Sequence, residues 1–127
     1  MNNPDAHELL MTARDVLMSR VFPLVPEDLH YEIRMIASAM GIAAREARDG
    51  HRTDRLEQDF LSGVIDEDSS GKNLSDLRAS VAGAIRDGLF VESEEQRHCL
   101  ERILLETTLN ALEINNPKVA RKWRERQ

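Results

Sequence analysis

Residues 31–46, with the sequence YEIRMIASAMGIAARE, constrain the fold of this chain more than any other segment. Apolar residues recur here at helical spacing on nearly every side of one helix. A helix that is apolar all round is normally the buried central element of a helical fold. Charged side chains along such a helix must be paired, or must reach a surface at which something binds. We therefore expect the functional residues here, and place Tyr31, Arg34, Arg45 and Glu46 first.

Start and stop signals for helices extend over the rest of the chain. Proline, glycine and small polar residues divide the sequence into segments whose apolar residues recur at spacings of three and four. Because only 4% of the residues are aromatic, the core must be built from aliphatic side chains and alanine, which favours closely packed helices. The predicted helices are 4–21 (capped by Asn3), 27–49 (ended by Gly50), 53–64 (capped by Thr53), 75–87 (capped by Ser75 and ended by Gly88), 93–114 (with a capping box of Ser93 and Gln96) and one from Pro117 onward.

The sequence therefore predicts an all-α fold, a compact bundle of five to six helices around a central apolar helix at about 27–49. A length of 127 residues suits one helical domain over residues 1–127. The segment 66–73, with the sequence DEDSSGKN, is the clearest loop. Only residues 89–91 resemble a strand, and they are too short and have no partner.

Charge and hydropathy limit the possible partners. The net charge is −6, and residues 57–95 hold ten acids against three bases. A nucleic-acid backbone needs a broad basic face, so we expect no nucleic-acid partner. No apolar run approaches the roughly 20 residues that span a bilayer, so we expect no membrane partner. The N-terminal sequence does not resemble a signal peptide, and one cysteine suits a reducing compartment, so a cytoplasmic location is expected.

Two partial metal motifs are present, and neither is complete. The Glu-x-x-His spacing of di-iron bundles occurs at Glu27 with His30 and at Glu95 with His98. Both pairs fall in the first turn of a predicted helix, where side chains are usually solvated. The loop that starts at Asp66 matches the first half of an EF-hand, but Leu77 stands where a bidentate glutamate is needed. We therefore expect no metal site.

No catalytic set can be assembled from the sequence. Cys99 would need a base and an orienting group, but His98 precedes it directly and points about 100° away on a helix. We expect Cys99 to be packed or half-buried. The chain has no phosphate-binding glycine loop, serine nucleophile elbow or Rossmann fingerprint. A binding or accessory role is therefore favoured over an enzyme, and no cofactor is expected.

An arginine cluster follows the end of the central helix and admits two interpretations. Its members could hold a phosphate of CoA or of a nucleotide, or an acidic partner surface. They could also complement the helix dipole and pair with Glu46, Asp49 and Asp54. Both interpretations stay open. The cluster consists of Arg45, Arg48, His51, Arg52 and Arg55, of which Arg48 and Arg52 join the candidate binding residues.

The segment from Arg34 to Glu46, RMIASAMGIAARE, resembles the core signature of a family of small bacterial helical proteins, a domain of unknown function. In that family an arginine opens a helix of small residues that closes with Arg-Glu. The early Glu8-Leu9-Leu10 and the late Asn116-Pro117 are similar to its two ends. Many members carry asparagine where this chain has Ser38.

The resemblance implies an interaction partner. Members of that family lie beside genes for acyl-CoA dehydrogenases and for kinases of the aminoglycoside-phosphotransferase type. The resemblance therefore implies a non-catalytic accessory subunit that binds and supports such a kinase, which acts on hydroxyacyl-CoA substrates, with an acyl-CoA dehydrogenase as a further partner. Two alternatives stay open: a helical domain that binds CoA or a nucleotide phosphate, and a homodimer without ligand.

Overall fold

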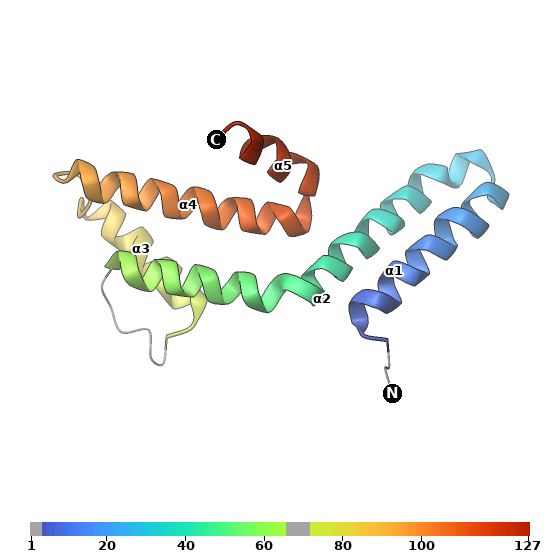
Figure 1. Cartoon of the computed structure of the whole chain (residues 1–127), viewed down its shortest axis with the longest axis horizontal. Helices are drawn as coiled ribbons and strands as arrows, with labels where there is room; N and C mark the ends of the chain where they lie inside the picture. Colours follow the sequence, from blue (N-terminus) through green and yellow to red (C-terminus); the bar gives the residue numbers. More distant parts are fainter. Residues whose placement is uncertain (1–3, 66–71) are drawn as a thin grey trace. The chain divides into compact units, whose positions relative to one another are not determined.

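The computed structural model describes residues 4–65 and 72–127, and this part of the chain contains α-helices, short helical turns and no strand (Figure 1). The predicted all-α class is confirmed. The five α-helices of these residues are α1 (Ala6–Val16), α2 (His30–Ile65), α3 (Leu74–Arg86), α4 (Glu94–Asn115) and α5 (Pro117–Glu125).

Helix α1 starts one residue after Asp5, whose carboxylate accepts a 2.8 Å hydrogen bond from the backbone N–H of Glu8. The predicted cap, Asn3, lies outside the described residues. After Val16 the chain continues as a π-helical turn, Leu17–Val21, and then as short 3-10 turns, Phe22–Leu24 and Glu27–Leu29. The prolines of this elbow stop the α-helix because they lack a backbone N–H.

Helix α2 continues without a break through Gly50 to Ile65. The predicted end at Gly50 and the separate helix at 53–64 are therefore wrong. A glycine ends a helix when it adopts the left-handed conformation. Among the described residues only Gly88 has a positive φ, at 79°. The cost of one glycine inside a helix, about 1 kcal/mol, is small enough for the neighbouring turns to offset.

The chain forms two compact units, and α2 belongs to both. The first unit comprises the residues up to Gly50 together with Ile114–Asn116, and the second comprises His51–Glu113 and Pro117–Gln127. Since one helix passes through both units, the single domain expected over residues 1–127 stays a prediction.

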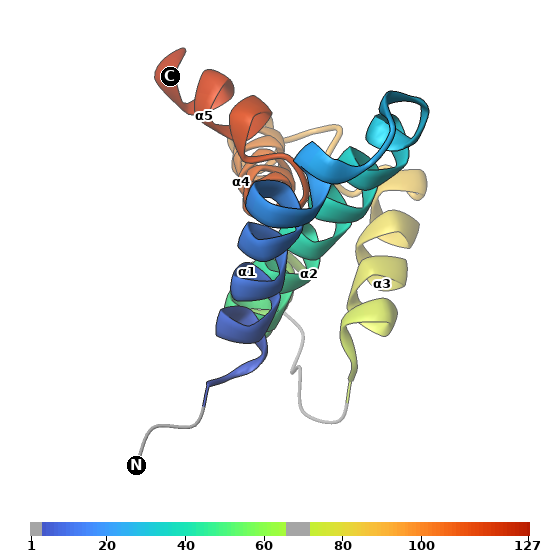
Figure 2. The ribbon, with the colours of Figure 1, turned by 90° about the vertical axis from the view of Figure 1, so that its right-hand side faces the viewer.

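In the first unit, α1 and the first part of α2 form an antiparallel helical hairpin (Figure 2). Two side chains of α1 attach to the backbone of α2. Arg14 Nε donates to the carbonyl of Ala37 at 3.0 Å, and a ring nitrogen of His7 lies 2.8 Å from the carbonyl oxygen of Ala44. These contacts fix which face of α2 lies against α1.

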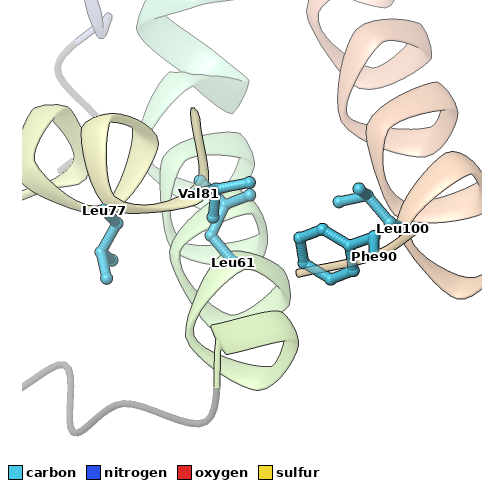
Figure 3. Close-up of a cluster of buried hydrophobic side chains, with 5 residues drawn as sticks. All are labelled: Leu61, Leu77, Val81, Phe90 and Leu100. Carbon is cyan, nitrogen blue, oxygen red and sulfur yellow. The ribbon is translucent and has the colours of Figure 1, made fainter. Parts of the chain in front are cut away.

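The second unit holds a hydrophobic core. One buried cluster brings together Leu61 of α2, Leu77 and Val81 of α3, Phe90 of the turn between α3 and α4, and Leu100 of α4 (Figure 3). Helix α3 begins after Asn73, which accepts a 2.8 Å hydrogen bond from the N–H of Asp76, so the predicted cap at Ser75 is two residues too late.

The predicted beginnings of α4 and α5 are confirmed. Ser93 Oγ accepts a 3.2 Å hydrogen bond from the N–H of Gln96, as the capping box requires. Helix α5 starts at Pro117. Its residue Arg124 reaches α4, where its Nε donates to Glu113 at 2.7 Å. In the described part of the chain, no helix is both apolar enough and long enough to cross a membrane.

Candidate interaction surface

Small residues line the covered face of α2 in the first unit. Ile33, Ala37 and Ala44 are buried, at 8%, 3% and 0% exposed. They recur at spacings of four and seven and so share one face of the helix. Because two of them are alanines, α1 can approach closely, and its His7 and Arg14 reach backbone carbonyls of α2 directly.

The opposite face of α2 carries apolar side chains that remain uncovered. Tyr31 is 69% exposed and Met35 is 54% exposed, Ala39 is exposed, and Ile42 is half-buried. Spacings of four, four and three place these residues in one row along the helix. We call Tyr31, Met35, Ala39 and Ile42 the α2 strip. The expectation that this helix is buried on all sides is therefore wrong, since α1 covers only one face.

Two carboxylates flank the α2 strip. Glu32 lies beside its first residue, and Glu46 follows Ile42 by one helical turn. Both side chains are exposed. Neither has a hydrogen-bond or ion-pair partner among residues 4–65 and 72–127. The strip is thus an apolar row with an unpaired negative charge near each end.

The arginines predicted to act beside Tyr31 and Glu46 are held elsewhere. The guanidinium of Arg34 lies over the ring of Phe22, 5.1 Å from its centroid. Arg45 Nε donates a 2.7 Å hydrogen bond to the carbonyl of Ile114. Within the described residues, no hydrogen bond or ion pair joins any two of these four predicted side chains. Their role in binding a partner stays a prediction.

Comparison with known proteins gives one result. The sequence pattern of the family described as Domain of unknown function (DUF6285) matches residues 23–119, which is most of the chain. The chain belongs to this family. No curated protein and no solved structure matches it. The matched region of the DUF6285 chain contains the whole α2 strip and leaves out α1, the helix that covers the other face.

In the DUF6285 chain, the arginine cluster at the middle of α2 is divided. Arg48 pairs with the neighbouring Asp49 at 3.2 Å, one of the pairings that the sequence allowed. Arg45 and Arg48 belong to the first unit, and Arg52 belongs to the second. The interpretation that the cluster binds a phosphate stays a prediction.

The metal-like motifs of the DUF6285 chain lie apart. The ring of His30 stacks on Phe22, with centroids 4.1 Å apart, and its Nε2 lies 3.0 Å from the carbonyl oxygen of Val25. His98 lies 3.9 Å from Glu94 and 3.8 Å from Glu101 on the exposed face of α4. No group of three or more His, Cys, Asp or Glu in residues 4–65 and 72–127 is placed to hold a metal ion. The EF-hand-like residues 66–71 lie outside the described residues.

Cys99 is exposed, so the expectation of a packed or half-buried thiol is wrong. It lines an open hollow of about 940 Å³ in the second unit together with Phe60, Arg102 and Ile103. Among residues 4–65 and 72–127 no side chain forms a hydrogen bond with its sulfur, and the neighbouring His98 lies beside glutamates. We therefore assign no chemistry to this thiol.

In the second unit, Arg78 and Arg124 form surface ion pairs with glutamates of neighbouring helices, and these pairs were not predicted from the sequence. Arg78 donates two hydrogen bonds of 2.7 Å to Glu57, and these bonds raise the pKa of Arg78. Burial lowers the pKa of Arg124, but its hydrogen bonds to Glu113 and Glu106 outweigh burial and raise the pKa overall. Both arginines are thus held to neighbouring helices. Spacing within one helix cannot reveal such pairs, because their partners lie on other helices.

Proposed function

We propose that this chain is a non-catalytic accessory subunit in the bacterial cytoplasm that binds and supports a kinase of the aminoglycoside-phosphotransferase type, acting on hydroxyacyl-CoA substrates. The identity of the kinase, with an acyl-CoA dehydrogenase as a further partner, comes from the family resemblance. Membership in a domain family of unknown function is compatible with such a role.

The observation that supports a binding role is the uncovered apolar surface of the first unit. Monomeric proteins rarely expose many large apolar side chains close together, and such surfaces usually mark interaction sites. Here the exposed fractions range from 42% for Val21 to 85% for Leu24. The large apolar side chains exposed in this unit are Leu9, Val16, Val21, Leu24, Leu29, Tyr31, Met35 and Ile36.

The charged side chains of the first unit also support a protein partner. The arginines on the hairpin are engaged with their own chain, since Arg14 and Arg45 donate to backbone carbonyls and Arg34 lies over Phe22. A stable protein complex needs roughly 800 Å² of surface from each partner, with an apolar centre and a polar rim. The first unit offers both an apolar surface and exposed charges around it.

Co-expression tests this proposal. The tagged chain is produced with a phosphotransferase-type kinase from the same organism, and the complex is measured by size-exclusion chromatography with light scattering. We expect stoichiometric recovery of the kinase, and a higher melting temperature of the kinase in the complex than alone. A kinase that elutes separately and melts unchanged would refute the proposal.

Arg34→Ala refines the test. We expect this variant to weaken the complex about tenfold or more, because Arg34 holds Phe22 and the elbow that borders the exposed surface. Arg20→Ala, at another exposed arginine of the same unit, serves as the matched control. Circular dichroism of the free variant distinguishes a loss of binding from a loss of folding. If Arg34→Ala unfolds the chain, Arg34 has a structural role and not a binding role.

A further inference from the structure

We propose that the α2 strip binds one amphipathic helix of a partner protein, and that the apolar face of this helix carries a lysine or arginine near each end. This inference rests on the proposed function only in that the occupant is a protein. It names the kind of element that the surface accepts and the charges that this element must bring.

The shape of the strip favours a helix as occupant. Small Ala39 lies between the larger Met35 and Ile42, so the row is low in the middle and higher on either side. Side chains of a second helix fit between residues spaced three and four apart, and an alanine at the centre lets the two backbones approach closely. Tyr31 extends the row by a further turn and adds a polar hydroxyl at its edge.

The flanking acids set the charge of the occupant. Glu32 and Glu46 are separated by nearly four turns, or about 21 Å along the axis. Both are exposed and lack a partner within the described residues. The nearby cation Arg45 is engaged with the carbonyl of Ile114 and does not neutralise them. A partner with a basic residue near each end of its apolar face complements this pattern, whereas an acidic one is repelled.

The chain itself fits the strip poorly. If two copies paired antiparallel through their strips around Ala39, Glu32 of one copy would face Glu46 of the other, and like charges would repel. Helix α5 is basic, but its nine residues span only about 14 Å and cannot reach both acids. We therefore assign the strip to a different protein.

Synthetic peptides test the inference without the kinase. One peptide is an amphipathic helix of about six turns, with a leucine and alanine face and lysines placed about four turns apart. The matched peptide carries glutamates at the two lysine positions. Binding of each labelled peptide to the full chain is measured by fluorescence anisotropy at low and at moderate ionic strength. We expect the lysine peptide to bind about tenfold more tightly, with a difference that shrinks as salt rises.

Three variants make the test specific. The double change Glu32→Lys with Glu46→Lys should reverse the order of the two peptides. Ala39→Glu should weaken binding of the lysine peptide about tenfold or more, because it places a charge in the centre of the apolar row. Ala13→Glu is the matched control, since Ala13 is an exposed alanine on α1, the helix that covers the other face of α2. Unchanged thermal melting of each variant confirms that it folds.

The outcomes separate the inference from the proposed function. Equal binding of both peptides, or no effect of Ala39→Glu, overturns the inference. A dimer in light scattering that Ala39→Glu converts to monomer also overturns it, because a second copy is then the occupant. If the Ala39→Glu variant still binds the kinase, the proposed function stands and the α2 strip is excluded as the kinase-binding site. Peptide binding that follows the expected pattern, without any kinase complex, supports the strip and refutes the proposed function.

Discussion

At the scale of single residues, Arg45 joins two segments of the first unit that are far apart in the sequence. Its Nε donates a 2.7 Å hydrogen bond to the carbonyl of Ile114, which lies 69 positions further along the chain. That carbonyl belongs to the last turn of α4, where backbone carbonyls lack a partner within the helix. A positively charged donor suits this end of a helix because of its dipole. Arg45 therefore holds the turn around Ile114 in the first unit.

Replacing Arg45 by methionine tests this assignment. Methionine keeps an unbranched stem and removes the donor, so the carbonyl of Ile114 loses its partner. We expect the free energy of unfolding to fall by about 1.5–3 kcal/mol, the range for a hydrogen bond to a charged group. Urea denaturation measures the change. Arg48→Met is the control, since Arg48 forms an exposed ion pair with the neighbouring Asp49, and its replacement should cost less than about 0.5 kcal/mol.

At the scale of elements, α2 is the feature that the sequence described least well. A glycine with arginines on both sides is typical of a helix end, yet α2 continues through Gly50. A β-carbon at Gly50 would lie 2.5 Å from Oε1 of Glu46. That oxygen is the far end of a flexible side chain, which can rotate toward solvent. Nothing in the backbone at Gly50 therefore requires glycine.

Two glycine substitutions within α2 test its continuity, and a third at Gly88, after α3, gives the contrasting case. Gly50→Ala should stabilise the chain by about 0.5–1 kcal/mol, because alanine has the higher helix propensity. Gly63→Ala should do the same, since no atom lies within 4 Å of its added β-carbon. Gly88→Ala should destabilise by about 1 kcal/mol because its φ of 79° disfavours a side chain. Thermal unfolding measures all three, and a destabilised Gly50→Ala would mean that α2 ends there.

The beginning of α3 gives a second test at this scale. Asn73 accepts the hydrogen bond from the N–H of Asp76, so Asn73→Ala should lower the free energy of unfolding by about 1 kcal/mol. Ser75→Ala, inside the first turn, should change it by less than about 0.5 kcal/mol. Denaturant titration of both variants decides between the two caps. The reverse order of effects would restore the cap predicted from the sequence.

The sequence predicted helix number and order better than the faces that the helices bury. The cap at Ser93, the start at Pro117 and the stop at Gly88 follow from local backbone chemistry and were predicted correctly. The exposure of the α2 strip depends on which neighbours exist. Periodicity shows that a side of a helix is apolar and does not show whether another helix covers it. The stacking of Arg34 on Phe22 was missed for the same reason.

At the scale of the whole molecule, the two units differ in how much apolar volume they bury. The second unit buries leucine and valine side chains from three helices, and a phenylalanine from the turn between α3 and α4, in one cluster. The covered face of α2 in the first unit buries one isoleucine, with alanines in place of larger side chains. A region that buries more apolar surface has a higher free energy of local opening, because opening exposes that surface to water.

Hydrogen exchange should therefore distinguish the two units. We expect backbone amides of α1 to exchange at least about tenfold faster than those around Leu61 and Leu77, since opening α1 exposes little large apolar surface. Mass spectrometry of peptic fragments measures both regions in one experiment. Equal protection of α1 and α3 would show that the chain opens only as one unit.

The chain has a single tyrosine and a single tryptophan, and each lies in a different unit. Tyr31 belongs to the α2 strip, while Trp123 lies on α5 with the guanidinium of Arg126 5.8 Å from its ring centroid. These two residues are built-in optical reporters, so no dye is needed to tell the units apart. A molecule that docks on the strip should alter tyrosine absorbance and leave tryptophan emission unchanged.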